Sequence, residues 1–327
     1  MHRRFFVSLF AALCFAARVN AATLYSDDFN VDDSASWNIN KANTASSSTS
    51  LPVSDTTNSA EFGYDYGTNM GIPVAPHTTD SSTKGLRLRS NISGGISGAV
   101  SVSPTGLSLP AAGYRLQFDA WGNFVNGGAN STEAMSVGIG TTGTVPQWSF
   151  NPNGALGFAT VRDGGTTNTD FRVYLNSGNQ AATTGYYQAG NTAASLDNAN
   201  SYYSFLPAQT VPVAQVTLFP TQAGTATPVG TISFAWHTVT VDNDGTDATW
   251  SIDGKAIAVV PLSAATLAGS NFYLGSFDTN NGSSSGNGQL LNFDLIDNLS
   301  VISVPEPSTI ALCLLGAMGL VAGRRRG

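Results

Sequence analysis

The sequence predicts an all-β domain folded as an antiparallel β-sandwich of about a dozen strands. Apolar and polar residues alternate in short runs, which is the period of half-buried strands. The connectors between the runs are rich in Gly, Asn, Asp, Ser and Thr and are too short for crossover helices, which favours antiparallel pairing. No stretch between the two chain ends sustains a helical apolar period for three turns.

The clearest strand is YRLQFDAW, residues 114–121. Alternation places Tyr114, Leu116 and Phe118 on one face and Trp121 on the other. We expect further strands at the runs GLRLRS, GAVSVS, MSVGIG, LGFATV, FRVYL, VAQVTLF, WHTVTV, ATWSI, AIAVVPL, FYLGSF and FDLIDNLSVI.

One hairpin is predicted from its turn. In the segment WHTVTVDNDGTDATWSIDGKAIAVV, Asp253 and Gly254 separate two strand-like runs. Both residue types tolerate the positive φ of a type I′ turn. We therefore expect a tight hairpin there.

The N-terminal residues 1–21 have the pattern of a secretory signal peptide, removed by signal peptidase. Arg3 and Arg4 precede an apolar stretch, and the run Val19-Asn20-Ala21 offers a cleavage site. A lipoprotein signal through Cys14 is disfavoured because Leu13 is large for the position before a lipidated cysteine. We take residues 22–303 as one domain and residues 304–327 as a separate C-terminal segment.

Charge and cysteine content exclude several function classes. Residues 22–304 contain eight cationic and 20 acidic side chains, a formal charge of −12, which disfavours nucleic acid and anionic membranes as partners. Both cysteines, Cys14 and Cys313, lie in the terminal segments. The domain therefore has no disulfide, no thiolate nucleophile and no cysteine-ligated zinc.

The C-terminal segment combines three features. Pro305, Glu306 and Pro307 precede an apolar run of 14 residues, 309–322, and Arg324, Arg325 and Arg326 follow it. As a helix the run spans roughly 21 Å, short for a hydrocarbon core of about 30 Å, and the arginines would stay cytoplasmic and stop translocation. The segment is a marginal tail anchor or a transient retention signal.

This ending resembles the PEP-CTERM sorting signal of Gram-negative bacteria. The resemblance implies recognition by a membrane-embedded exosortase, processing near Pro305-Glu306-Pro307, and delivery to the cell surface or an exopolysaccharide matrix. It also implies transient membrane association through the C-terminal helix.

The domain itself resembles the laminin G and concanavalin-like jelly rolls. The hairpin segment around Asp253, the opening LYSDDFNVDDSASW and the close FDLIDNLSV carry this resemblance. Other carbohydrate-module sandwiches give a similar alternation.

Two long polar insertions, residues 41–71 and 176–205, interrupt the strand rhythm. Their many tyrosines argue against simple spacers. We expect ordered loops over the concave face of the sandwich or at one end of it.

Catalytic patterns are weak in this chain. Jelly-roll glucanases use two carboxylates close together on one strand, whereas Glu61 and Glu133 are 72 positions apart. Asp119, Asp294 and Asp297 are possible substitutes, although aspartates at strand ends more often make turns or bind cations. Cleavage of a polysaccharide by a glycosidase is therefore less favoured than a function without catalysis.

Histidine and serine chemistry are also disfavoured. His77 and His237 are the only histidines of the domain, so no three-histidine metal set exists. His237 is in register with Val239 and Val241, as expected for a packed strand residue. No Gly-x-Ser-x-Gly elbow is backed by an available histidine.

Calcium is the favoured ion because the turns are rich in hard oxygen ligands. The resemblance to lectin-like sandwiches brings the first and last strands together, with Asp27 or Asp28 and Asp297 with Asn298 as candidate ligands. Asp28 and Asp297 are the favoured pair. The alternative is that both side chains cap turns.

Sugar recognition would use flat aromatic faces surrounded by amides and carboxylates. The candidates are Trp121, Trp148, Tyr64 and Tyr66, with Trp121 favoured because it leaves the apolar register of its strand. The alternative is that the tryptophans fill the core.

These observations predict an exported protein of the cell envelope, outer surface or extracellular matrix that binds extracellular polysaccharide without catalysis. A purely structural matrix protein is the second hypothesis, and a polysaccharide-cleaving enzyme is the third.

Overall fold

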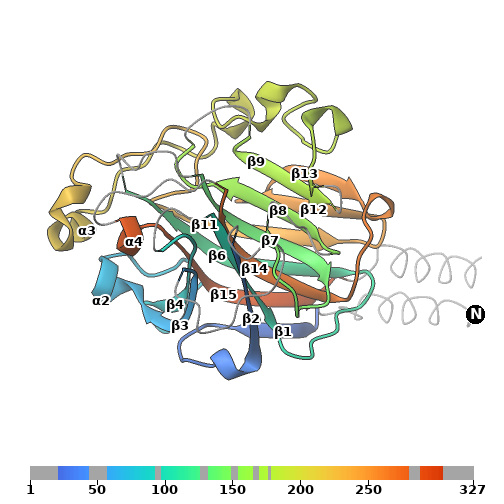
Figure 1. Cartoon of the computed structure of the whole chain (residues 1–327), viewed down its shortest axis with the longest axis horizontal. Coiled ribbons are helices and arrows are strands. Elements are labelled where there is room, and N and C mark those ends of the chain that lie inside the picture. The colour runs from blue at the N-terminus through green and yellow to red at the C-terminus, as the bar shows by residue number, and fades with distance from the viewer. Residues whose placement is uncertain are drawn as a thin grey trace, which may run out of the picture.

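The computed structural model shows two antiparallel β-sheets packed face to face (Figure 1). It describes residues 21–43, 57–92, 97–125, 132–148, 154–164, 169–175, 178–279 and 288–304. The expected signal peptide and the C-terminal helix lie outside these residues. Among the described residues, no helix is both long and apolar enough to cross a membrane.

The first sheet, sheet A, has eight strands in the order β13-β12-β11-β6-β15-β4-β3, with β1 also paired to β15. Their bounds are β1 Thr23–Asp27, β3 Ser59–Asp65, β4 Lys84–Arg89, β6 Tyr114–Asn123, β11 Trp236–Asn243, β12 Asp247–Ile252, β13 Lys255–Pro261 and β15 Phe293–Ser303.

The second sheet, sheet B, has seven strands in the order β10-β9-β8-β7-β14-β5-β2. Their bounds are β2 Trp37–Asn43, β5 Gly98–Pro104, β7 Glu133–Thr141, β8 Leu156–Val161, β9 Phe171–Leu175, β10 Gly178–Asn179 and β14 Asn271–Asp278. The strand pairings in both sheets are antiparallel, which confirms the predicted fold class.

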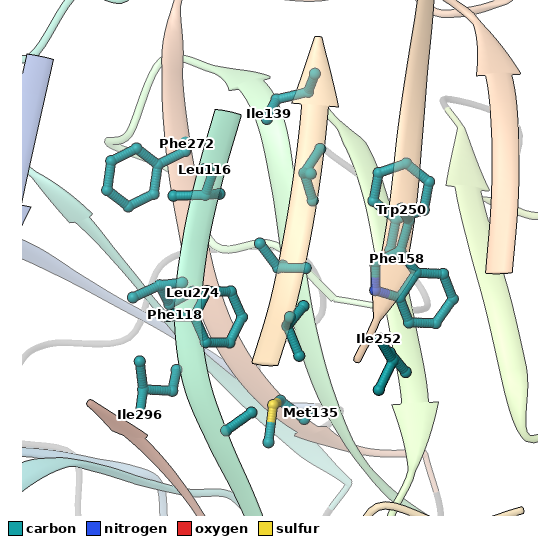
Figure 2. Packing of buried hydrophobic residues seen from close by; sticks show 14 of the residues in the cluster. Leu116, Phe118, Met135, Ile139, Phe158, Trp250, Ile252, Phe272, Leu274 and Ile296 are labelled. Carbon is teal, nitrogen blue, oxygen red and sulfur yellow. The ribbon is translucent and has the colours of Figure 1, made fainter. Parts of the chain in front are cut away.

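The main core lies between the sheets. Leu116 and Phe118 of β6 point into it, as alternation predicts, and both are at most 1% exposed. Figure 2 shows these two side chains beside Phe272 and Leu274, which come from β14 in the opposite sheet. Apolar burial on this scale is the main stabilising contribution to a domain that lacks disulfides.

The predicted hairpin is confirmed. Ile252 pairs with Lys255, which leaves Asp253 and Gly254 as a two-residue loop between β12 and β13. Both have positive φ, 49° and 76°, the combination that a type I′ turn requires.

Short helices lie at one end of the sandwich (Figure 1). They are α2 Tyr66–Met70, α3 Val213–Leu218 and α4 Gly288–Leu291. The expected strand VAQVTLF is wrong, because its first six residues form α3. Pro212 directly precedes this helix and Pro220 follows it, so the apolar run is confined to less than two turns.

Both insertions contain ordered structure. The first includes β3, an edge strand of sheet A that was expected to be loop. In the second, Tyr203 stacks on Phe171 with ring centroids 3.8 Å apart, and the Tyr187 hydroxyl donates to the Gln180 carbonyl. These tyrosines pack against the main core and close one end of it.

The structure also contains short 3₁₀ turns. Those of the second insertion are Ala182–Thr184, Ala193–Leu196 and Ser201–Tyr203, and those elsewhere are Ser34–Ser36, Pro220–Gln222 and Leu262–Ala264.

Candidate functional site

A groove of about 650 Å³ opens on the outer face of sheet A, where β1 meets β15. It is lined by Tyr25, Ser26, Asp27, Asp28, Asp33, Ser36, His77, Gln117, Asn298, Leu299 and Ser300. We call it the groove. Its lining contains three carboxylates and no lysine or arginine.

A bulge in β15 forms one side of the groove. β15 pairs with β4 as far as Ile296 and with β1 from Leu299 onwards, and its register on β6 shifts between Asp297 and Ser300. Asn298 sits in this bulge with φ of 52°, a left-handed conformation that asparagine tolerates better than most residues. The bulge therefore turns the Asn298 side chain towards the segment that covers the sheet.

That segment, residues 72–80, crosses the outer face of sheet A, and we call it the strap. The Trp236 indole donates to the Pro73 carbonyl at 2.7 Å, and Asn298 Nδ2 donates to Thr78 Oγ1 at 2.9 Å. Asn30 Nδ2 donates to Asp80 Oδ2 at 3.1 Å. Three hydrogen bonds, at Pro73, Thr78 and Asp80, therefore hold the strap in place.

Asp119 of β6 is the fully buried anchor of the strap. Its Oδ1 lies 2.6 Å from His77 Nδ1, and its Oδ2 accepts from the His77 backbone N–H at 3.0 Å and from Asn298 Nδ2 at 2.9 Å. The two carboxylate oxygens of Asp119 thus make three contacts with His77 and Asn298. Asp119 therefore positions His77 at the groove, and its own oxygens are occupied by these contacts.

Asp297 lies opposite Asp119 on the neighbouring strand. Its Oδ2 accepts from the Tyr66 hydroxyl at 2.9 Å and its Oδ1 from the Asn298 backbone N–H at 2.7 Å. Burial, together with the charges of Asp119 and Asp28, raises the pKa of Asp297 to about 7, against the lowering effect of these two hydrogen bonds. The structure therefore brings Asp28, Asp297 and Tyr66 into one neighbourhood.

Asp27 and Asp33 form a carboxyl pair at the groove wall. Asp27 accepts from the Phe29 backbone N–H at 2.8 Å and from the Trp37 indole at 3.1 Å. Burial raises the pKa of Asp27 to about 6, and the nearby Asp33 carboxylate acts in the same direction.

A calcium ion at Asp28 and Asp297 fits this geometry poorly. Both oxygens of Asp297 already accept hydrogen bonds, whereas Asp28 is exposed. Within the described ranges, no group of three or more acidic, histidine or cysteine side chains is placed to hold a metal. The calcium site stays a prediction.

Three of the four predicted sugar-contacting aromatic residues are buried instead of forming a platform. Trp121 does lie on the outer face of sheet A, but it is 1% exposed because a second apolar cluster covers it. Tyr66 belongs to the same cluster at 0%, and Trp148 is 7% exposed in an alanine-rich cluster on sheet B. The prediction of exposed ring faces at these three residues is wrong.

Tyr64 keeps part of its surface exposed, but an arginine covers one face of its ring. The Arg87 guanidinium lies 3.6 Å from its ring centroid, and Arg87 and Arg89 both pair with Glu61. Tyr64 lies on β3, and it is not among the residues that line the groove.

Sequence reasoning missed most residues of the groove, including His77 and Gln117. The polar position of Asp119 on the outer face of a strand was a usable signal, because a buried aspartate needs donors. Nothing in the sequence indicates that the donors come from residues 77 and 298.

Comparison with known proteins identifies the C-terminal segment. Residues 303–326 match the PEP-CTERM protein-sorting motif. This match confirms the predicted motif at Pro305, Glu306, Pro307 and the arginine cluster, all of which lie outside the described residues. The motif implies export, processing by exosortase and sorting to the cell surface in bacteria. The chain matches none of the curated proteins with which it was compared.

Solved structures with a similar fold include an endo-1,3-beta-glucanase from Streptomyces sioyaensis, at 14% identity and a TM-score of 0.45, covering 89% of this chain and 99% of that one. A glycoside hydrolase family 16 endo-glucanase from Bacteroides ovatus has 15% identity and a TM-score of 0.41, covering 85% and 99%. A structure from work on endo-acting O-glycanases of the human gut microbiota has 12% identity and a TM-score of 0.44, covering 87% and 100%. The likeness to these structures is distant, and the fold of this chain is established by its own strand pairings.

Proposed function

We propose that this chain is a surface-sorted protein of a Gram-negative-type bacterium whose β-sandwich binds a neutral extracellular polysaccharide in the groove without cleaving it. The exopolysaccharide matrix is the proposed destination, reached after transient membrane association through the C-terminal segment. The observation that carries the proposal is the groove itself, with about 650 Å³ of space and a lining of hydrogen-bonding side chains.

The lining favours hydroxyl groups as ligands. Carboxylates accept hydrogen bonds from sugar hydroxyls, while Asn298 and Gln117 can both donate and accept. Because Asp27, Asp28 and Asp33 face the groove without a cation, a phosphorylated, sulfated or uronate-rich glycan would meet repulsion. A neutral glycan avoids this cost.

The carboxyl groups favour binding over cleavage. Glycosidases need two carboxyl groups flanking the scissile bond, one of them free to give its proton to the leaving group. Glu61 is held by Arg87 and Arg89, and Glu133 accepts from Asn292. Asp294 pairs with the buried Arg162. The pair that faces the groove is Asp27 with Asp33, so these two residues are the ones to test for catalysis.

The test measures binding of the purified protein to soluble neutral polysaccharides and to uronate-rich ones by calorimetry. Asp28→Asn removes a charged acceptor from the groove, and we expect it to weaken neutral-glycan binding by roughly tenfold. Asp247→Asn, on β12 outside the groove lining, is the matched control and should bind as the unmodified protein does.

The outcomes separate the three functions. Lack of binding to every glycan would favour the structural matrix protein. Release of reducing sugar that Asp27→Asn or Asp33→Asn abolishes would show a glycosidase. Preference for the uronate-rich polymer would contradict the charge argument.

A further inference from the structure

His77 is the strap residue that lines the groove, and a buried carboxylate orients its side chain. Asp119 Oδ1 lies 2.6 Å from His77 Nδ1, and Asp119 Oδ2 accepts from the His77 backbone N–H at 3.0 Å. The same carboxylate therefore holds both the ring and the backbone of His77. We call these two residues the dyad.

The two side chains of the dyad differ in exposure. The Asp119 side chain is completely buried, whereas that of His77 is 49% exposed. Because Nδ1 is turned towards the buried carboxylate, the exposed edge of the ring is the one that carries Nε2. No residue in the described part of the chain makes a hydrogen bond to Nε2. The ring therefore presents a free nitrogen to the groove.

The hydrogen bonds around Asp119 determine which ring nitrogen can take up a proton. Asp119 Oδ2 accepts from two N–H groups, those of the His77 backbone and of Asn298 Nδ2, as expected for an ionised carboxylate. Because a carboxylate can only accept, the neutral ring carries its proton on Nδ1, and Nε2 keeps a lone pair. A histidine oriented in this way by a carboxylate is the usual arrangement of a general base.

Gln117 places a side-chain amide next to the dyad. It precedes Asp119 by two positions on β6, so the two residues share the outer face of sheet A with about 7 Å between their Cα atoms. Gln117 is half-buried and lines the groove. Its amide N–H groups can donate to a ligand oxygen. The groove thus offers a base and a neutral hydrogen-bond donor from neighbouring positions.

The strap does not need an exposed imidazole to stay in place. Pro73, Thr78 and Asp80 each hold it through a hydrogen bond, and the His77 backbone N–H adds one more. None of these four contacts involves the ring. An exposed ring with a free nitrogen inside a groove is therefore better explained by contact with a ligand.

We propose that the dyad hydrolyses ester substituents, such as O-acetyl groups, on a polysaccharide held in the groove. This inference rests on the proposed function, because the groove must first bind the glycan, and the reaction leaves the glycosidic bonds intact. Hydrolysis of an ester requires a base that activates water, whereas cleavage of a glycosidic bond requires an acid for the leaving group. An acetylated sugar is uncharged, in agreement with the three carboxylates of the groove.

In this reaction His77 moves one proton and forms no bond to carbon. Nε2 takes the proton from a water molecule as the water oxygen bonds to the ester carbonyl carbon. The carbonyl oxygen gains negative charge in this step, and the Gln117 amide is the neutral donor that stabilises it. The carbon–oxygen bond to the sugar then breaks, and His77 returns the proton to the sugar oxygen. The products are acetic acid and a free sugar hydroxyl.

The test measures acetate release from dextran, xyloglucan and laminarin that have been acetylated chemically. We expect the unmodified protein to release acetate from at least one of them, and His77→Gln to lower kcat by roughly 10²–10⁴-fold at saturating polysaccharide. Thr78→Val is the matched control on the strap, because it removes the hydrogen bond from Asn298 and leaves the dyad in place. It should keep the activity of the unmodified protein. An unchanged unfolding midpoint verifies the fold of each variant.

A further variant tests Asp119 as a positioning residue. Asp119→Asn keeps the shape of the side chain but loses the charge that keeps the ring proton on Nδ1. We expect kcat to fall by roughly tenfold or more with KM unchanged. A merely structural role would lower the unfolding midpoint and leave kcat of the folded protein constant. His77→Gln, at an exposed position, carries the test if Asp119→Asn does not fold.

The outcomes separate this activity from binding. Glycan binding without acetate release from any of the acetylated polysaccharides would overturn the activity of the dyad and leave the proposed function standing. Acetate release that His77→Gln does not diminish, or that Thr78→Val diminishes equally, would overturn the role of His77. If no polysaccharide binds the unmodified protein, the proposed function fails and the inference with it.

Discussion

Asp170 is a buried carboxyl group that joins β9 to the second insertion. Its Oδ2 accepts from the Asn198 backbone N–H at 2.9 Å, and its own N–H donates to the Leu196 carbonyl at 2.8 Å. Burial raises its pKa from an ordinary value of 3.8 to about 6, with the charges of Asp197 and Asp163 acting in the same direction. Asp170 is therefore protonated more readily in the folded state than in the unfolded state.

The raised pKa gives a pH dependence of stability. The folded state binds more protons than the unfolded state between about pH 4 and pH 6, so the free energy of unfolding falls as pH rises through this window. Because Asn does not titrate, we expect Asp170→Asn to reduce the fall in the free energy of unfolding across this window by up to roughly 3 kcal/mol. The amide oxygen of the new side chain can still accept from the Asn198 backbone N–H. Urea unfolding at pH values on both sides of the window measures the effect. Equal slopes in Asp170→Asn and in the control Asp247→Asn would contradict it.

Trp121 shows how far alternation can predict the environment of a residue. The pattern correctly places it on the face of β6 opposite the main core. It cannot show that Tyr66 and Phe234, which are distant in sequence, cover that face. Exposure depends on such long-range packing, whereas alternation reports only the direction of a side chain.

Because Trp121 is buried, we expect Trp121→Ala to destabilise the fold by about 3–5 kcal/mol. The half-buried neighbour Trp236 is the comparison, and Trp236→Ala should cost less. Chemical unfolding measures both. A stable Trp121→Ala variant with specifically impaired glycan binding would contradict the buried position.

At the scale of elements, the β12–β13 turn also holds the start of β11. Asp253 lies in the turn, and its carboxylate contacts His237 Nδ1 at 2.7 Å and accepts from the Thr238 backbone N–H at 2.9 Å. The hydrogen bond with His237 and the charge of that side chain lower the pKa of Asp253 against the effect of burial. The turn therefore links three strands.

We expect Asp253→Ala to reduce stability by about 1–3 kcal/mol, because it leaves His237 buried without this partner. Asp253→Asn keeps an acceptor and a side chain that tolerates positive φ, so it should retain most of the stability. Thermal unfolding of the two variants tests this order. Equal losses in both would show that the negative charge, and not the hydrogen bonds, stabilises the turn.

Elements with strong local signals were predictable, and those with weak ones were not. The turn at Asp253-Gly254 is determined by two adjacent residues with special backbone preferences. The run at residues 213–218 is too short for its period to separate helix from strand, and β3 is an edge strand with only one buried side chain, Phe62.

At the scale of the whole molecule, the two-sheet architecture follows from alternation summed over many strands. The pairing order does not, because strands that are neighbours in space, such as β15 and β6, are distant in sequence. The groove depends on that order, since its walls come from residues 25–36, 77, 117 and 298–300. It could not be located before the fold was known.

The predicted calcium site is testable on the whole protein. An ion bound only by the folded state at Asp28 and Asp297 would raise the midpoint of thermal unfolding, and EDTA would reverse the shift. Asp28→Asn should then abolish the response, while Asp247→Asn should leave it intact. An identical midpoint with calcium and with EDTA would exclude the site.

The pairing of β1 with β15 brings the two ends of the domain together. The Ser303 backbone N–H donates to the Ala22 carbonyl at 2.8 Å, and the Ala22 N–H donates to Ser303 Oγ at 2.7 Å. The residues before Ala22 and the sorting segment after Ser303 are therefore attached at one point of the sandwich. Because β15 lies inside sheet A, between β6 on one side and β4 and β1 on the other, the sheet cannot be complete until this last strand is in place. We therefore expect the fold to be completed by the residues that directly precede the sorting motif at residues 303–326.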